Sequence, residues 1–335
     1  MSTGFVPKFE LTERLACKAS IMIEGLSGKG KSGLALMLAF GLAGGFKPEI
    51  REDLATQKEI WKKVFAVDTE NKSLNLFVGL LGSWGTPYQR FYSYQLTEDI
   101  GYRPSNYLAL RKAAIENHGE VFIGDSITHM WNAHGGVLDM VNQYKLDNPS
   151  ANQYTVWGQP EINEEKLRIV ETMRHKDIHC ITTVRVKEKH DLVYNEEKKK
   201  NEVVSLGEQQ IQQGDLKYEP DLVIRMLRAG NQDGTTPMVK VLKSRYAIFK
   251  EDEEYEITPD LCEQLRTYLE EGVDVDTILE QQRQDYIVAV KTFLDNNEAA
   301  RPIWAMLKED AGHKDTKLND LPLPVLKSLY MQINN

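Results

Sequence analysis

A short apolar segment, Ile21-Met-Ile-Glu24, runs directly into the glycine-rich segment Gly25-Leu-Ser-Gly-Lys-Gly-Lys31-Ser32. The apolar segment is typical of a short buried strand, and residues 31–42 are typical of a helix. Glycines between a strand and a helix permit a tight turn with left-handed backbone angles. The sequence therefore predicts a strand, a glycine-rich loop and a helix in direct succession.

The glycine-rich segment fits the pattern G-x-x-x-x-G-K-[ST] at every fixed position. In this pattern the backbone N–H groups of the loop and the start of the helix surround phosphate oxygens. The lysine, here Lys31, reaches the β- and γ-phosphates, and the hydroxyl of Ser32 binds Mg²⁺. The alternative is a glycine-rich turn in which the lysines stand by chance. The residues expected to bind the nucleotide are Gly25, Ser27, Gly28, Lys29, Gly30, Lys31, Ser32 and Gly33.

Strand-like and helix-like segments alternate along most of the chain. The apolar strand-like segments after the loop are 64–67, 121–124 and 178–184. Such alternation predicts an α/β fold with a parallel sheet and crossover helices. Segments 221–227 and 237–243 are joined by the turn-rich Gly230-Asn-Gln-Asp-Gly234 and predict an antiparallel hairpin that ends the sheet.

Carboxylates stand at the ends of two of these strands. Asp125 follows segment 121–124, where a carboxylate is placed to hold Mg²⁺ or its water shell; the alternative is a residue that caps a helix or a turn. Glu70, just after segment 64–67, is placed to orient and deprotonate an attacking water. Asp68 is the competing candidate, and its alternative role is to accept hydrogen bonds from local backbone N–H groups.

Two cations follow the last strand of the hairpin, in Lys243-Ser-Arg245. Residues two apart on a strand share one side of the sheet, so Lys243 and Arg245 project together. An edge strand can offer them to a neighbouring subunit, where they would neutralise γ-phosphate charge as an arginine finger does. The alternative is a solvated edge strand whose basic residues discourage aggregation.

This order of motifs resembles that of RecA-type ATPases. The loop is followed by Asp68-x-Glu70, by Asp125-Ser126, by the strand Ile181-Thr-Thr-Val-Arg185 and by Lys243-x-Arg245. The match covers about residues 15–250 and is most similar to the small RecA-like ATPases of phages, which assist single-strand annealing and recombination. The sensor position of the family, usually a glutamine, corresponds to Thr183.

The resemblance implies a RecA-like P-loop NTPase core over residues 1–250, with a mostly parallel twisted sheet, helices on both faces and an antiparallel hairpin at its end. It implies ATP and Mg²⁺ as ligands, Glu70 as the catalytic carboxylate, and subunits stacked head to tail in a filament or ring. Lys243 and Arg245 would then act across the subunit interface. It also implies a phage-encoded protein of the host-cell cytoplasm that acts on single-stranded DNA.

The resemblance places DNA-binding loops at about residues 132–161 and 187–218. Aromatic stacking beside a basic track is how single strands are bound without sequence preference. The alternative is that the tryptophan is a core residue and that the lysines form a solvated hairpin tip among glutamates. The candidate DNA contacts are Trp157, Lys187, Lys189, Lys198, Lys199 and Lys200.

Charge divides the chain unevenly. The net charge is −9, and residues 251–335 carry 19 acidic and 8 basic residues. Helical patterns in this part predict a small acidic C-terminal domain over 251–335, which could dock a protein partner or compete with DNA; the alternative is a helical domain with a solvated face. Three scattered cysteines fit a reducing cytosol, and no apolar run is long enough to span a membrane.

Two other functions remain open from the sequence. One is a nucleotide-dependent assembly or switch ATPase that acts on a protein partner through the C-terminal helices. The other is a hexameric motor of the helicase type. Stimulation of ATP turnover by single-stranded DNA would distinguish the recombination ATPase from the protein-directed one.

Overall fold

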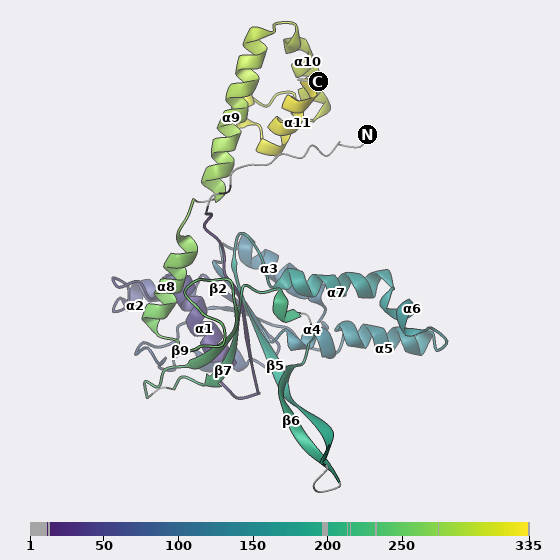
Figure 1. Ribbon diagram of the computed structural model, residues 1–335. Coiled ribbons are helices and arrows are strands. Elements are labelled where there is room, and N and C mark those ends of the chain that lie inside the picture. The colour runs from purple at the N-terminus through teal and green to yellow at the C-terminus, as the bar shows by residue number, and fades with distance from the viewer. Residues whose placement is uncertain are drawn as a thin grey trace. The chain divides into compact units, whose positions relative to one another are not determined.

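The structure is a computed structural model that describes residues 12, 14–195, 200–212, 214, 216–231, 233–273 and 275–333 (Figure 1). For residues 188–195, 200–208, 275, 276 and 278 it describes the backbone alone. Contacts divide the chain into a larger unit, Cys17–Leu269, and a smaller unit, Met1–Ala16 with Glu270–Asn335.

The larger unit is an α/β fold built on one mixed sheet. Its described strands follow the order β3-β2-β4-β5-β1-β7-β8-β9, and β6 pairs with β5 outside this path. Strands β3, β2, β4, β5, β1 and β7 are parallel, whereas β6, β8 and β9 join by antiparallel pairing. The strands are β1 (Ser20–Gly25), β2 (Val64–Asp68), β3 (Tyr92–Gln95), β4 (Val121–Asp125), β5 (His179–Asn195), β6 (Lys200–Gln210), β7 (Leu222–Arg228), β8 (Met238–Ser244) and β9 (Glu254–Glu256).

Helices cover both faces of the sheet, as the α/β prediction requires. One face carries a core in which Phe40, Trp61 and Leu265 are buried, and the rings of Phe40 and Trp61 stack at 4.7 Å. The helices on that face are α1 (Lys31–Leu42), α2 (Leu54–Trp61) and α8 (Pro259–Glu270). The helices on the other face are α3 (Pro104–Glu116), α4 (Thr128–Asn132), α5 (Val137–Asp147), α6 (Gln153–Trp157) and α7 (Pro160–Thr172). The predicted fold class, a mostly parallel sheet with helices on both faces, is confirmed.

Strand register brings the polar strand ends to one edge of the sheet. Asp68 lies beside Asp125, and Gly25 lies beside Arg185. The carboxyl ends of parallel strands are where ligands bind in open α/β sheets. The fold therefore gathers the glycine-rich loop and the carboxylates of β2 and β4 at a single edge.

Two segments differ from the loops expected for DNA binding. Residues 132–161 are largely helical and contain α5 and α6. Asn152 caps α6 by accepting the N–H of Thr155 at 3.0 Å, and Asp139 of α5 accepts the N–H of Gly135 at 2.8 Å just before that helix. Residues 187–218 begin with a long antiparallel hairpin, in which β5 extends beyond the sheet and pairs with β6. Figure 1 shows this hairpin projecting from the body of the larger unit.

The smaller unit has a helical core of its own. Ile287, Val290, Trp304 and Leu326 are buried in it, within α9 (Val275–Asn296), α10 (Ala300–Asp310) and α11 (Leu323–Ile333). The division falls after Leu269 rather than at residue 250, because Cys262, Leu265 and Leu269 of α8 are buried in the core of the larger unit. None of the described helices is long and apolar enough to cross a bilayer.

Candidate nucleotide-binding site

The loop between β1 and α1 has the backbone that the glycine pattern predicts. Gly30 precedes α1 with φ 86°, in the left-handed region, and a Cβ there would lie 2.6 Å from the Cβ of Ala229. Glycine therefore meets two demands at this position, one conformational and one steric. The first N–H groups of α1 have no partner within the helix, which makes this end of α1 suited to an anion.

Lys31 is folded back against the loop that it follows. Its Nζ donates hydrogen bonds to the carbonyls of Gly25, at 2.9 Å, and of Leu26, at 2.8 Å. Burial lowers the pKa of Lys31, and the charges of Glu70 and Asp125 oppose that change. The ammonium is thus held at the loop by carbonyl groups, and both acids act on it electrostatically.

Asp125 ends β4 as a buried carboxylate with an incomplete set of partners. It is 1% exposed, and the hydroxyl of Thr183 donates to its Oδ1. Burial raises the pKa of Asp125, and the nearby hydroxyls of Ser32 and Thr183 oppose the rise. Its Oδ2 is buried and has no hydrogen-bond partner among the described atoms. A buried carboxylate oxygen without a donor, near the Ser32 hydroxyl, is suited to a hard cation.

The two acids at the end of β2 have different surroundings. Asp68 is fully buried and accepts the N–H groups of Glu70, at 2.6 Å, and of Leu74, at 2.9 Å. It therefore holds the connection after β2 in shape, which was the alternative role for this residue. Glu70 is partly exposed, and its Oε1 receives Nη2 of Arg185 at 2.8 Å and Nε at 3.0 Å.

Thr183 and Arg185 lie two residues apart on β5. Thr183 is fully buried, its hydroxyl binds Asp125, and its carbonyl accepts Ile127 N–H at 3.0 Å. The predicted sensor position is thus tied to the proposed metal ligand. Arg185 was not among the predicted site residues, although its position two residues after Thr183, on a strand expected beside the loop, could have indicated it.

A small pocket adjoins the loop on the α1 side. Its volume is about 210 Å³, and Tyr88 donates from its hydroxyl to the carbonyl of Gly33 at 3.4 Å. The sequence did not indicate this pocket, because its walls come from three separate segments of the chain. The lining residues are Gly30, Gly33, Leu34, Met37, Phe77, Leu80, Leu81, Ser83, Tyr88, Gly230, Asn231 and Pro237.

Lys243 and Arg245 lie away from the loop of their own chain. Ser244, between the two cations, is in register with Leu222 of β7, and Leu222 is in register with Ile21 near the start of β1. Ile21 lies about 13 Å along β1 from Gly25, where the loop begins. Lys243 donates to the carbonyls of Tyr218 and of Pro220, the latter at 2.5 Å, and Arg245 pairs with Asp221 at 2.8 Å. The structure does not bring these two cations to the other predicted site residues. Nor is β8 the last strand, because β9 pairs with its first half.

The candidate DNA contacts lie in two separate places. Trp157 ends α6. Its ring stacks on that of Trp131, with ring centroids 6.0 Å apart, and packs against the core, so Trp157 is a partly buried core residue. Lys187 is exposed at the base of the β5–β6 hairpin. Lys189 and Lys200 lie on the hairpin where the backbone alone is described, and Lys198 and Lys199 lie outside the described residues.

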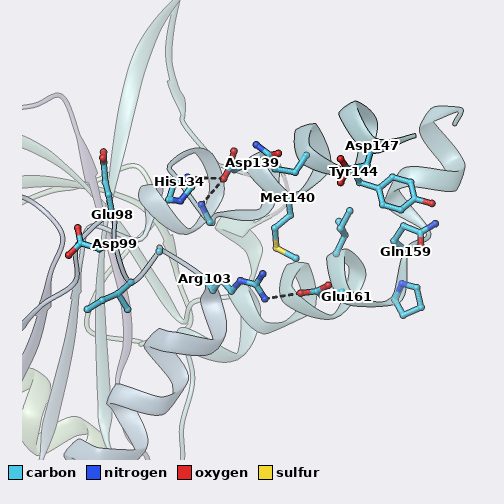
Figure 2. A pocket seen from close by; sticks show the side chains of 16 residues that line it. Glu98, Asp99, Arg103, His134, Asp139, Met140, Tyr144, Asp147, Gln159 and Glu161 are labelled. Carbon is cyan, nitrogen blue, oxygen red and sulfur yellow. Dashed lines mark hydrogen bonds and ion pairs between the residues drawn. The ribbon is translucent and has the colours of Figure 1, made fainter. Parts of the chain in front are cut away.

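A larger cavity of about 670 Å³ lies elsewhere, between the β3–α3 connection, α5 and the start of α7. Figure 2 shows its lining, in which Arg103 pairs with Glu161 at 2.8 Å and His134 with Asp139 at 3.2 Å. Carboxylates outnumber cations along its walls, so its potential disfavours phosphate groups. Its acidic residues are Glu98, Asp99, Asp139, Asp147 and Glu161.

Comparison of the chain with models of known protein families and with curated proteins found no match. The geometry of the loop and of the sheet edge beside it is therefore the basis for assigning a function.

Proposed function

We propose that the chain is an ATPase with a RecA-like core that acts on single-stranded DNA. The observation that carries the proposal is the meeting of three groups at one sheet edge. These are the glycine-rich loop with Lys31, the incompletely partnered carboxylate of Asp125, and the partly exposed carboxylate of Glu70. Loop, cation-binding acid and water-orienting acid are the parts that phosphoryl transfer to water requires.

Ser32 and Asp125 would hold Mg²⁺ beside the nucleotide. The unpartnered Oδ2 of Asp125 supports this assignment, because a cation would complete its environment. Bound Mg²⁺ supplies charge neutralisation on the β- and γ-phosphate oxygens. No three His, Cys, Asp or Glu side chains in the described part of the chain gather into a metal cluster, which fits an ion held largely by phosphates and water.

Hydrolysis would proceed by in-line attack of water. Glu70 orients the water and accepts its proton as the oxygen bonds to the γ-phosphorus. The bond from that phosphorus to the β–γ bridging oxygen breaks, and ADP and phosphate leave. Lys31, released from the carbonyls of Gly25 and Leu26, stabilises the charge on the phosphoryl oxygens.

The pocket beside the loop would take the base of the nucleotide. Phe77 and Tyr88 line it, with ring centroids 5.2 Å apart, and the Met37 side chain adds to its apolar wall. Aromatic and aliphatic walls suit the faces of a purine, while the loop holds the phosphates.

A head-to-tail oligomer would explain the position of Lys243 and Arg245. Both cations lie near the amino-terminal ends of the parallel strands, whereas the loop lies at their carboxyl ends. A neighbouring copy could bring these cations to the nucleotide of the next subunit. The projecting β5–β6 hairpin, with exposed Lys187 at its base, is our candidate for the contact with single-stranded DNA.

Phosphate release from ATP tests this proposal, measured with and without single-stranded DNA across a salt series. We expect turnover that DNA stimulates, stimulation that declines as salt rises, and loss of turnover in Lys31→Ala. Lys62→Ala is the control, because Lys62 is an exposed lysine that pairs with Glu59 on α2. Normal turnover in Lys31→Ala would reject the nucleotide site, and turnover indifferent to DNA would reject the DNA partner.

A further inference from the structure

Arg185 is bound to the carboxylate that the proposed function makes catalytic. Two of its nitrogens, Nη2 at 2.8 Å and Nε at 3.0 Å, converge on Oε1 of Glu70. Both side chains are partly shielded, with 34% of Arg185 and 25% of Glu70 exposed. Two charged donors on one carboxylate oxygen make a stronger contact than a single neutral hydrogen bond does, and they leave Oε2 free of Arg185.

The backbone of Arg185 is anchored on both sides. Its N–H donates to the hydroxyl of Thr128 at 2.9 Å, its carbonyl accepts the N–H of Ile211 at 2.9 Å, and β1 pairs with it through Gly25. Glu70 lies in the connection after β2, where its N–H is bound by Asp68. The ion pair therefore ties a carboxylate on a connecting segment to a residue held within the sheet.

The pair lies within the electrostatic reach of the loop lysine. The charges of Glu70 and of Arg185 both act on the Lys31 ammonium, in opposite directions. Arg185 also lowers the pKa of the partly buried His129, although desolvation is the larger cause there. Arg185 is thus part of the site rather than of a remote surface.

We propose that Arg185 is a positioning residue that holds the Glu70 carboxylate toward the attacking water. The inference rests on the proposed function, because it assigns a supporting partner to the acid of that same site. Glu70 uses Oε1 for Arg185, so Oε2 is the oxygen that takes the proton of the water. Without the guanidinium, the side chain gains rotamer freedom, and fewer of its conformations are productive.

The position of Arg185 also links Glu70 to the hairpin. Arg185 is the last residue of β5 that pairs with β1, and the pairing of β5 with β6 starts at the next residue, Val186. A displacement of the hairpin would act on the residue that holds the carboxylate. Single-stranded DNA bound there would therefore change the turnover number more than nucleotide affinity.

Steady-state ATP hydrolysis by Arg185→Ala and Arg185→Lys tests the inference, with binding of a fluorescent ATP analogue measured in parallel. We expect Arg185→Ala to lower kcat about tenfold, with KM and analogue affinity changed less than about twofold. Arg185→Lys should recover part of kcat, because the charge remains while the second donor nitrogen of the guanidinium is lost. Arg103→Ala is the matched control, because Arg103 forms a 2.8 Å pair with Glu161 in the acidic cavity.

Several outcomes would overturn the inference. An unchanged kcat in Arg185→Ala would show that Glu70 needs no such partner, and a raised kcat would show that the pair restrains it. A fall in kcat, analogue affinity and melting temperature together, without recovery in Arg185→Lys, would indicate a structural role only. A wild-type protein that binds the analogue but releases no phosphate would reject the proposed function itself, and the inference with it.

Discussion

Asp125 is suited to bind a cation, but its buried charge lowers the stability of the protein when no cation is bound. Its carboxylate is buried, one oxygen lacks a donor, and burial raises its pKa. An ionised group with a raised pKa in the folded state weakens folding as the pH rises above the usual carboxyl range. Functional sites commonly hold such groups at the expense of stability.

Asp125→Asn should therefore separate stability from activity. The amide keeps an acceptor for the hydroxyl of Thr183 and removes the buried charge, so we expect the free energy of unfolding to rise by about 1 kcal/mol. ATP hydrolysis should fall to the level of Lys31→Ala. Urea unfolding without nucleotide at pH 8, together with phosphate release, measures both effects. Lower stability in the variant would contradict the assignment of Oδ2 as an unpartnered oxygen.

His179, at the start of β5, makes stability depend on pH. It is 4% exposed, its Nδ1 accepts the N–H of Ala19 at 2.8 Å, and burial lowers its pKa to about 3. In the unfolded chain the imidazole titrates near pH 6.5. Its contribution to stability is thus present above about pH 6.5 and is lost as the pH falls toward 3.

His179→Asn should remove that dependence while keeping an acceptor for Ala19. We expect the variant to be less stable than wild type at pH 8. The difference should shrink by up to about 1.4 kcal/mol per pH unit below pH 6.5, because only wild type must then keep an imidazole unprotonated. Urea unfolding at four pH values between 5 and 8 measures the difference. A difference that is constant with pH would show that His179 is not the titrating group.

The predictable parts of the fold are those that local sequence determines. The strand before the loop and the helix after it are continuous apolar segments, so β1 and α1 follow from the residues themselves. The positions of Asp125 and Glu70 at one edge follow from parallel pairing. The hairpin of β5 and β6 was expected only as the alternative to a DNA-binding loop, because the sequence does not show how far these strands extend beyond the sheet.

Other elements depend on contacts between distant segments and escaped prediction. The segment of α5 was expected to be part of a DNA-binding loop, although Val137, Val141 and Tyr144 recur in it at helical spacing. The Arg185–Glu70 pair joins residues 115 positions apart, and no local pattern indicates it. Lys243 and Arg245 are predictable as a pair of cations, but their distance from the loop follows from the register of β7 and β8.

The hairpin can be tested through Lys187, the exposed lysine at its base. If the hairpin contacts a DNA backbone, Lys187→Ala should weaken single-strand binding severalfold for every sequence tested. It should also reduce the slope of log affinity against log salt by about 0.7, the value for one phosphate contact on a single strand. Fluorescence anisotropy at five salt concentrations measures both. Lys112→Ala, at an exposed position of α3, is the control, and an unchanged slope in Lys187→Ala would place the DNA elsewhere.

The acidic character of the C-terminal third is divided between the two units. Residues 251–269 carry seven acidic residues and one basic residue, and residues 270–335 carry 12 acidic and seven basic residues. The first group lies on β9, α8 and their connections, which belong to the larger unit. Removing residues 251–335 would therefore change the core and the helical unit together, and a change in DNA affinity could not be assigned to either.

Two truncated chains distinguish the predicted domain boundary at residue 250 from the division after Leu269 that the contacts give. A chain that ends at Glu271 keeps α8, and a chain that ends at Lys250 loses Cys262, Leu265 and Leu269 from the core. Each buried apolar side chain contributes about 1.5–3 kcal/mol, so the shorter chain loses most of the stability of an ordinary domain. Thermal unfolding and binding of the fluorescent ATP analogue measure the consequence. We expect a cooperative transition and analogue binding only for the longer chain. The reason is that α8 completes the core against which α1, the helix that follows the loop, is packed. Equal behaviour of the two chains would show that the core is complete without α8.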